Sequence, residues 1–141
     1  FLETENLRLA CGELVHFAHW ITPEMMPKRF DTHFYLAKAP EDSLATHDGY
    51  ESVDSVWTTP SAAMEAERNG SRTIIFPTLR NVAKLAAFNS TSTALNAAAT
   101  SSVVTVLPWT EQREDGNYIC IPPEAGYDIA EERMPDRPKK D

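Results

Sequence analysis

The stretch 19–36 reads His-Trp-Ile-Thr-Pro-Glu-Met-Met-Pro-Lys-Arg-Phe-Asp-Thr-His-Phe-Tyr-Leu, and the expected fold depends on it. In its second half every other residue is largely apolar, which is typical of a strand with one buried face: Phe30, Thr32, Phe34 and Leu36. Residues 14–22 also have an extended pattern, which Pro23 ends. The sequence therefore predicts two strands, 14–22 and 29–37, joined by a short proline-bounded loop.

Strand and helix patterns alternate along the rest of the chain. A third strand is expected over 51–58, followed by helices over 60–69 and 79–88 that begin after Thr59 and Thr78, two residue types that cap helices well. We also expect helices over 4–13 and 91–100, and a late hairpin formed by strands 103–107 and 118–121. These patterns predict an α+β fold. The domain should cover 1–128, with a charged, flexible tail over 129–141.

Composition excludes several classes of protein. The 141 residues are enough for one domain. A net charge of -8 with 13 scattered basic residues argues against a nucleic-acid partner, which would require clustered Lys and Arg. No apolar run has the length of a membrane span, and no signal peptide is recognisable at Phe1, so we expect no membrane partner. Cys11 and Cys120 are expected to be free thiols in a reducing cytoplasm, with a disulfide as the alternative.

Four segments, in order, resemble one branch of the Nudix hydrolases, the branch similar to the peroxisomal coenzyme A diphosphatase. The first is the stretch Trp-x-Thr-Pro followed by Arg-Phe-Asp-Thr and an aromatic strand. Glu51 to Trp57, then Thr-Thr-Pro and an alanine-rich helix, are similar to the next part of that branch. Phe76-Pro77-Thr78 is similar to its helix start. The resemblance covers roughly 14–88 and implies a Nudix-like α/β/α sandwich around a mixed sheet.

The sequence does not contain the pattern of the catalytic helix that defines the Nudix family. Nudix enzymes hold Mg²⁺ or Mn²⁺ on several glutamates of one helix, since hard cations prefer oxygen ligands. No glycine-rich loop followed by an Arg-Glu-x-x-Glu-Glu pattern occurs in the sequence. We therefore expect a fold that is incomplete on its N-terminal side, with Mg or Mn bound by a complete parent protein and no cofactor in this chain alone.

The resemblance to the Nudix hydrolases suggests two functions. The first is the C-terminal part of a hydrolase that cleaves a nucleoside diphosphate linked to another moiety, with coenzyme A-type molecules among the candidate substrates. The second is a non-catalytic binding or oligomerisation module, which would form a homo-oligomer. A third reading is an unrelated α+β binding domain. Serine hydrolase chemistry has little support, because no Ser lies at a readable spacing from a His and an acid.

Glu51 is the candidate catalytic and metal-binding residue. In some Nudix enzymes a carboxylate from this region contributes to the metal site or acts as the base. The alternative is a solvated residue at the start of a strand. Asp54, three positions on, would face the other way in a regular strand, so the two carboxylates are not expected to share one ion.

Arg29 and Asp31 are the candidate substrate-binding residues. They share a strand face, and Lys28 and Arg29 suit the oxygens of a phosphate. The favoured alternative is a structural ion pair at the strand edge.

The histidines and tryptophans are expected to have structural or surface positions and no role in a functional site. His16 and His19 are three apart, so a regular strand would turn them to opposite faces and make them a poor metal pair. His33 is expected to be packed or exposed rather than part of a polar site with Asp31. Trp20 and Trp57 are expected in the core of neighbouring strands.

Overall fold

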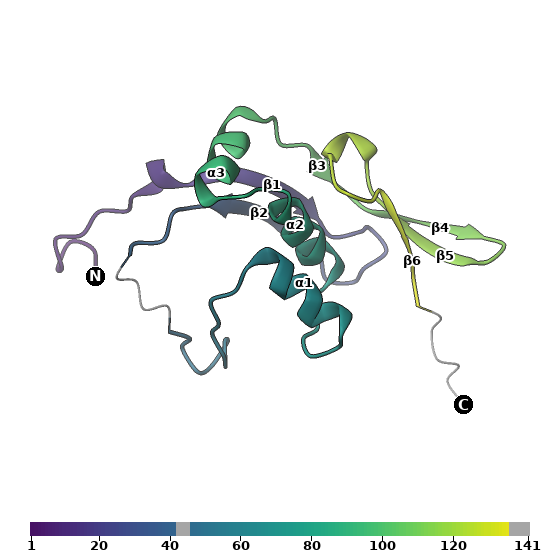
Figure 1. Cartoon of the computed structure of the whole chain (residues 1–141), viewed down its shortest axis with the longest axis horizontal. Coiled ribbons are helices and arrows are strands. Elements are labelled where there is room, and N and C mark those ends of the chain that lie inside the picture. Colours follow the sequence, from purple (N-terminus) through teal and green to yellow (C-terminus); the bar gives the residue numbers. More distant parts are fainter. Residues whose placement is uncertain (42–45, 136–141) are drawn as a thin grey trace.

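The computed structural model describes residues 1–41 and 46–135. Within these residues the chain has an α+β fold, with three α-helices and two three-stranded sheets (Figure 1). None of the helices in this part of the chain combines the length and the apolar composition that a membrane crossing requires.

The first sheet contains the two strands predicted from the stretch 19–36. Strand β1 (Val15–Ile21) pairs antiparallel with β2 (Asp31–Leu36), and β3 (Thr105–Val106) joins the other edge of β1 in parallel. The loop between β1 and β2 is closed at its base by a hydrogen bond from the Thr22 amide to the Phe30 carbonyl at 3.0 Å. In this register Thr32, Phe34 and Leu36 of β2 lie on the less exposed face of the hairpin, as their alternation predicts.

A β-bulge in β1 changes which residues face the core. His16 lies opposite Tyr35, but the next paired residue is Ala18, opposite Phe34, so Phe17 is the extra residue. Phe17 and Ala18 are consequently both buried, although they are neighbours in sequence. The bulge shifts the alternation of side chains by one position, and His16 and His19 come to lie on the same face of the sheet. The expectation that they face opposite ways was wrong for this reason.

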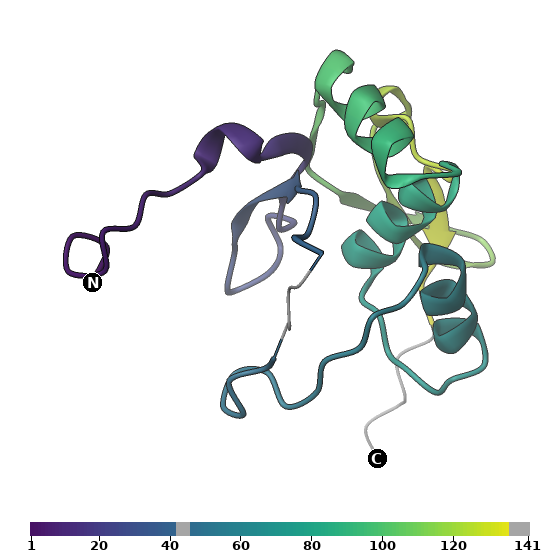
Figure 2. The same ribbon diagram turned by 60° about the vertical axis from the view of Figure 1, so that its left-hand side comes forward.

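Three helices follow β2. They are α1 (Pro60–Arg68), α2 (Phe76–Ala86) and α3 (Thr91–Thr100), with α2 and α3 on one side of the β1–β2 hairpin (Figure 2). Thr59 caps α1 as predicted, its side chain accepting the Ala62 amide. The cap predicted at Thr78 was wrong. Helix α2 begins at Phe76 because Pro77 has a suitable φ and needs no partner for an amide in the first turn.

The second sheet is formed by the C-terminal part of the chain. Strands β4 (Trp109–Arg113) and β5 (Gly116–Cys120) form a hairpin, and β6 (Glu131–Arg133) pairs with the other edge of β5. The predicted hairpin therefore has the wrong first strand, because 103–107 contributes to β3 instead. Strand β6 lies in the segment expected to be a flexible tail, and the end of that tail, 136–141, lies outside the described residues.

The core lies between the first sheet and the helices and continues to the second sheet. Trp20 is 3% exposed and contacts both Phe76 and Tyr127 edge-on, so its predicted core position is confirmed. The buried cluster combines β1, α3, β3 and the turn after β5: Phe17, Ala18, Trp20, Ala98, Val106, Ile121 and Ala125.

Two predicted elements are absent. Residues 4–13 form turns and a short 3₁₀ helix, η1 (Cys11–Glu13), because an isolated short helix is marginal without a surface to pack on. Residues 51–58 are irregular and exposed, with Trp57 69% exposed instead of buried. Strand propensity reflects packing and pairing with a neighbouring strand, and no described strand pairs with this segment.

Candidate functional site

The outer face of the first sheet, opposite the helices, carries a cluster of imidazoles around one carboxylate. His19 in β1 lies directly across from His33 in β2, and Asp31 is two residues before His33 on the same face. His16 reaches this face because of the bulge. The four side chains are called the histidine cluster below: His16, His19, Asp31 and His33.

Two hydrogen bonds and one longer ion-pair contact connect the members of the histidine cluster. The Nε2 atom of His19 lies 2.5 Å from Oδ1 of Asp31, and the Nε2 atom of His33 lies 3.6 Å from the same oxygen. On their other sides, Nδ1 of His19 is 2.8 Å from the Thr105 hydroxyl and Nδ1 of His33 is 3.1 Å from Nε2 of His16. His19 and His33 thus direct Nε2 toward Asp31, and each has a hydrogen-bond partner at Nδ1.

His19, at one end of the cluster, is mostly buried, whereas Asp31 and His33 are exposed. His19 is 15% exposed and stacks on His33 with ring centroids 4.0 Å apart and an interplanar angle of 9°. The side chains of His33 and Asp31 are 44% and 65% exposed. A ligand from solvent can therefore reach Asp31 and His33, while His19 is held between its stacking partner and Thr105.

Sequence reasoning missed this cluster although its residues are all close in sequence. The chain has four histidines, and three of them lie in the two strands of the opening motif. The signal was available, but a regular strand places His16 and His19 on opposite faces, and only the bulge brings them together.

The structure places Arg29 and Asp31 in separate interactions. Arg29 precedes β2 and donates from Nε to the Thr22 carbonyl at 3.0 Å, so it supports the base of the hairpin. Asp31 is directed to His19 and His33. Lys28 lies over the ring of Phe30 at 5.0 Å. Among the described residues no hydrogen bond or ion pair joins Arg29 to Asp31.

Glu51 lies in the exposed irregular segment after the loop. The carboxylate of Asp48 accepts the amides of Tyr50, Glu51 and Ser52 at 3.0–3.1 Å, and these hydrogen bonds hold the pKa of Asp48 below its ordinary value. Asp54 instead pairs with Arg72 at 2.7 Å, which lowers the pKa of Asp54. In residues 1–41 and 46–135 the donor atoms of His19, Asp31 and His33 are the only set of three that is close enough for one ion. The described carboxylates therefore do not fit the Mg²⁺ or Mn²⁺ site of the Nudix family.

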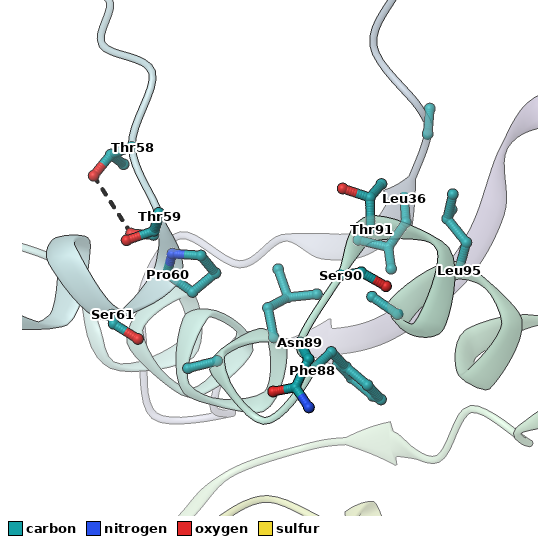
Figure 3. A pocket seen from close by; sticks show the side chains of 14 residues that line it. Leu36, Thr58, Thr59, Pro60, Ser61, Phe88, Asn89, Ser90, Thr91 and Leu95 are labelled. Carbon is teal, nitrogen blue, oxygen red and sulfur yellow. Dashed lines mark hydrogen bonds between the residues drawn. The ribbon is translucent and has the colours of Figure 1, made fainter.

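A pocket of about 500 Å³ lies between the end of β2, the start of α1 and the junction of α2 with α3 (Figure 3). Its walls are apolar side chains such as Leu36, Phe88 and Leu95, with the hydroxyls of threonine and serine residues between them. None of the lining residues carries a charge or titrates near neutral pH. This pocket can accept an apolar group but has no side chain to neutralise a diphosphate or to move a proton.

Comparisons of the chain with models of protein families, with curated proteins and with solved structures found no match.

Proposed function

We propose that these 141 residues act as the later part of a Nudix-type hydrolase that cleaves a nucleoside diphosphate linked to another moiety, with coenzyme A-type molecules among the candidate substrates. The observation that carries the proposal is the order and spacing of four motifs over 14–88. Two of these motifs lie in regular elements, since the first spans β1 and β2 and the Phe-Pro-Thr motif starts α2, whereas the segment from Glu51 to Trp57 is irregular. Four motifs in one order are more specific than any of them alone.

The exposed segment that contains Glu51 supports this proposal. Four large apolar side chains between positions 50 and 57 are exposed in the structure: Tyr50, Val53, Val56 and Trp57. A contiguous set of exposed apolar side chains usually marks a surface that contacts another segment or chain. In the proposed assembly a further strand would pair with this segment and bury Trp57.

The proposal assigns the metal chemistry to residues outside this sequence. Nudix hydrolysis requires several carboxylates on one divalent cation, and the described residues do not supply them. The chain alone would therefore be inactive, while Glu51 would reach the Mg²⁺ or Mn²⁺ site of the complete parent protein. Arg29 would remain a structural residue of the hairpin base. A cytoplasmic location, based on the two free cysteines, belongs to the same proposal.

The test compares the product of the complete reading frame with residues 1–141. Each protein is incubated with coenzyme A, ADP-ribose and a dinucleoside polyphosphate in the presence of Mg²⁺ or Mn²⁺. We expect hydrolysis by the longer product alone. Turnover by residues 1–141 at an ordinary enzymatic rate, about 1 to 1,000 per second, would contradict the proposal. A longer product that is inactive but forms dimers in sedimentation experiments would favour the alternative, a non-catalytic oligomerisation module.

A further inference from the structure

We infer that His19, Asp31 and His33 form a binding site for a divalent transition-metal ion such as Zn²⁺. The inference is independent of the proposed hydrolase function, because its ligands do not include Glu51 and its test requires no hydrolysis. It starts from the position of the donors: one ligand atom from each of the three residues lies within 4.8 Å of the other two.

The supporting hydrogen bonds fit a metal site. A histidine that binds a metal through one nitrogen almost always uses its other N–H in a hydrogen bond, which fixes the ring orientation. His19 and His33 both direct Nε2 toward Asp31, and both have a partner at Nδ1, the Thr105 hydroxyl and His16 respectively. The Thr105 hydroxyl can donate or accept, so it can support His19 with or without a bound ion.

The distances show how far the site must change on binding. Zn–N and Zn–O bonds of about 2.0–2.1 Å place the ligand atoms of a tetrahedral site about 3.3–3.4 Å apart. The separation of 3.6 Å between His33 Nε2 and Asp31 Oδ1 is already close to that value. His19 Nε2 and Asp31 Oδ1, at 2.5 Å, must separate by roughly 1 Å as an ion replaces the hydrogen bond between them.

One ring must also tilt. Each imidazole binds a metal in its own plane, and the planes of His19 and His33 are nearly parallel, with ring centroids 4.0 Å apart. His19 is held by Thr105, so His33 is the ring that has to turn. Its side chain is 44% exposed, which leaves it room to move without disturbing the core.

The ligand chemistry selects the class of ion. Two imidazole nitrogens with one carboxylate suit Zn²⁺, Co²⁺ and Ni²⁺, whereas Mg²⁺ and Ca²⁺ prefer oxygen ligands. Three protein ligands leave at least one coordination position for water or an external ligand.

The first experiment titrates the 141-residue chain with Zn²⁺ by calorimetry. We expect one ion per chain, and a loss in affinity of more than about 100-fold in Asp31→Asn and His33→Gln, larger than the effect of removing a supporting residue. His16→Gln should lose about 10-fold, because it removes only the partner of His33. The matched control is His47→Gln, which removes the exposed histidine outside the cluster. Cys11→Ser controls for the exposed thiol.

Nuclear magnetic resonance of the wild-type side chains provides a test that does not depend on variants. Addition of Zn²⁺ should shift the Nε2 resonances of His19 and His33 and leave those of His47 in place. No saturable binding at millimolar Zn²⁺, binding that Cys11→Ser abolishes, or unchanged affinity in folded Asp31→Asn would each overturn the inference. Circular dichroism of each variant establishes that it is folded.

Discussion

Arg80 donates from Nη1 to both carboxylate oxygens of Asp128, at 3.0 Å each, and so joins α2 to a residue 48 positions further along the chain. Two neighbouring side chains of α2 hold the same segment. Asn81 accepts the hydroxyl of Tyr127 at 2.8 Å, and Lys84 donates to the carbonyl of Ala125 at 3.2 Å. One polar stripe of α2 thus fixes the turn that follows β5.

The charge of Asp128 is expected to stabilise the fold. Arg80 is only 7% exposed and its other acidic neighbour, Glu132, is 3.9 Å away. Asp128→Asn leaves a buried guanidinium with a neutral partner and should lower the free energy of unfolding by about 1–3 kcal/mol in urea titrations. Glu124→Gln changes an exposed carboxylate of the same segment and should have little effect. Equal losses in the two variants would mean that net charge, and not the Arg80 contact, is responsible.

Tyr127 links two buried polar groups through one hydroxyl. It accepts the indole N–H of Trp20 at 2.8 Å and donates to Asn81, and burial raises its pKa. Tyr127→Phe keeps the ring but leaves both groups without this partner, so we expect a loss of about 1–3 kcal/mol in the free energy of unfolding. Tyr50→Phe removes a hydroxyl from a side chain that is almost fully exposed and serves as the control. A loss below about 0.5 kcal/mol in Tyr127→Phe would indicate that the two groups find other partners.

Ser90 is expected to stabilise α3 as an N-cap. Its side chain accepts the Thr93 amide, and the Thr93 side chain accepts the Ser90 amide, which completes a capping box. Ser90→Ala should cost about 1 kcal/mol. Asn96→Ala, at an exposed position inside the same helix, should raise stability slightly because alanine has the higher helix propensity. If thermal unfolding gave the same sign for both variants, the capping interpretation would fail.

Local signals explain which elements the sequence predicts well. β1, β2 and α1 follow from alternation and from Thr59, because these signals act over a few residues. The bulge places Phe17 in a buried cluster with Ala98 of α3 and Val106 of β3, which are distant in sequence, so the positions of His16 and His19 could not be predicted from their spacing alone. The prediction that Trp57 is buried was wrong for a similar reason, since its burial would require a strand partner that the described residues do not provide.

The two cysteines are expected to differ in reactivity. Cys11 is exposed, whereas Cys120 is buried in β5 and burial raises its pKa. Alkylation at pH 8 followed by mass spectrometry should modify Cys11 at once and Cys120 only after unfolding, since the thiolate is the reactive form. Because burial raises the pKa of the Cys120 thiol, the unfolded chain releases this proton at a lower pH than the folded chain, and the free energy of unfolding should decrease as the pH rises above about 9. Rapid labelling of Cys120 in the folded chain would contradict its buried position.

The Glu51 hypothesis predicts a catalytic effect without a stability effect. In the product of the complete reading frame, Glu51→Gln keeps the shape of the side chain and removes the charge that a metal ion or a water proton would use. If Glu51 has this role, kcat should fall about 100-fold or more, the scale of a lost general base. The thermal midpoint should stay unchanged, because Glu51 is exposed and only its backbone amide bonds to Asp48. Glu65→Gln, which changes an exposed carboxylate on α1, is the control. Full activity in Glu51→Gln would make Glu51 a solvated loop residue and would remove it from the proposed active site.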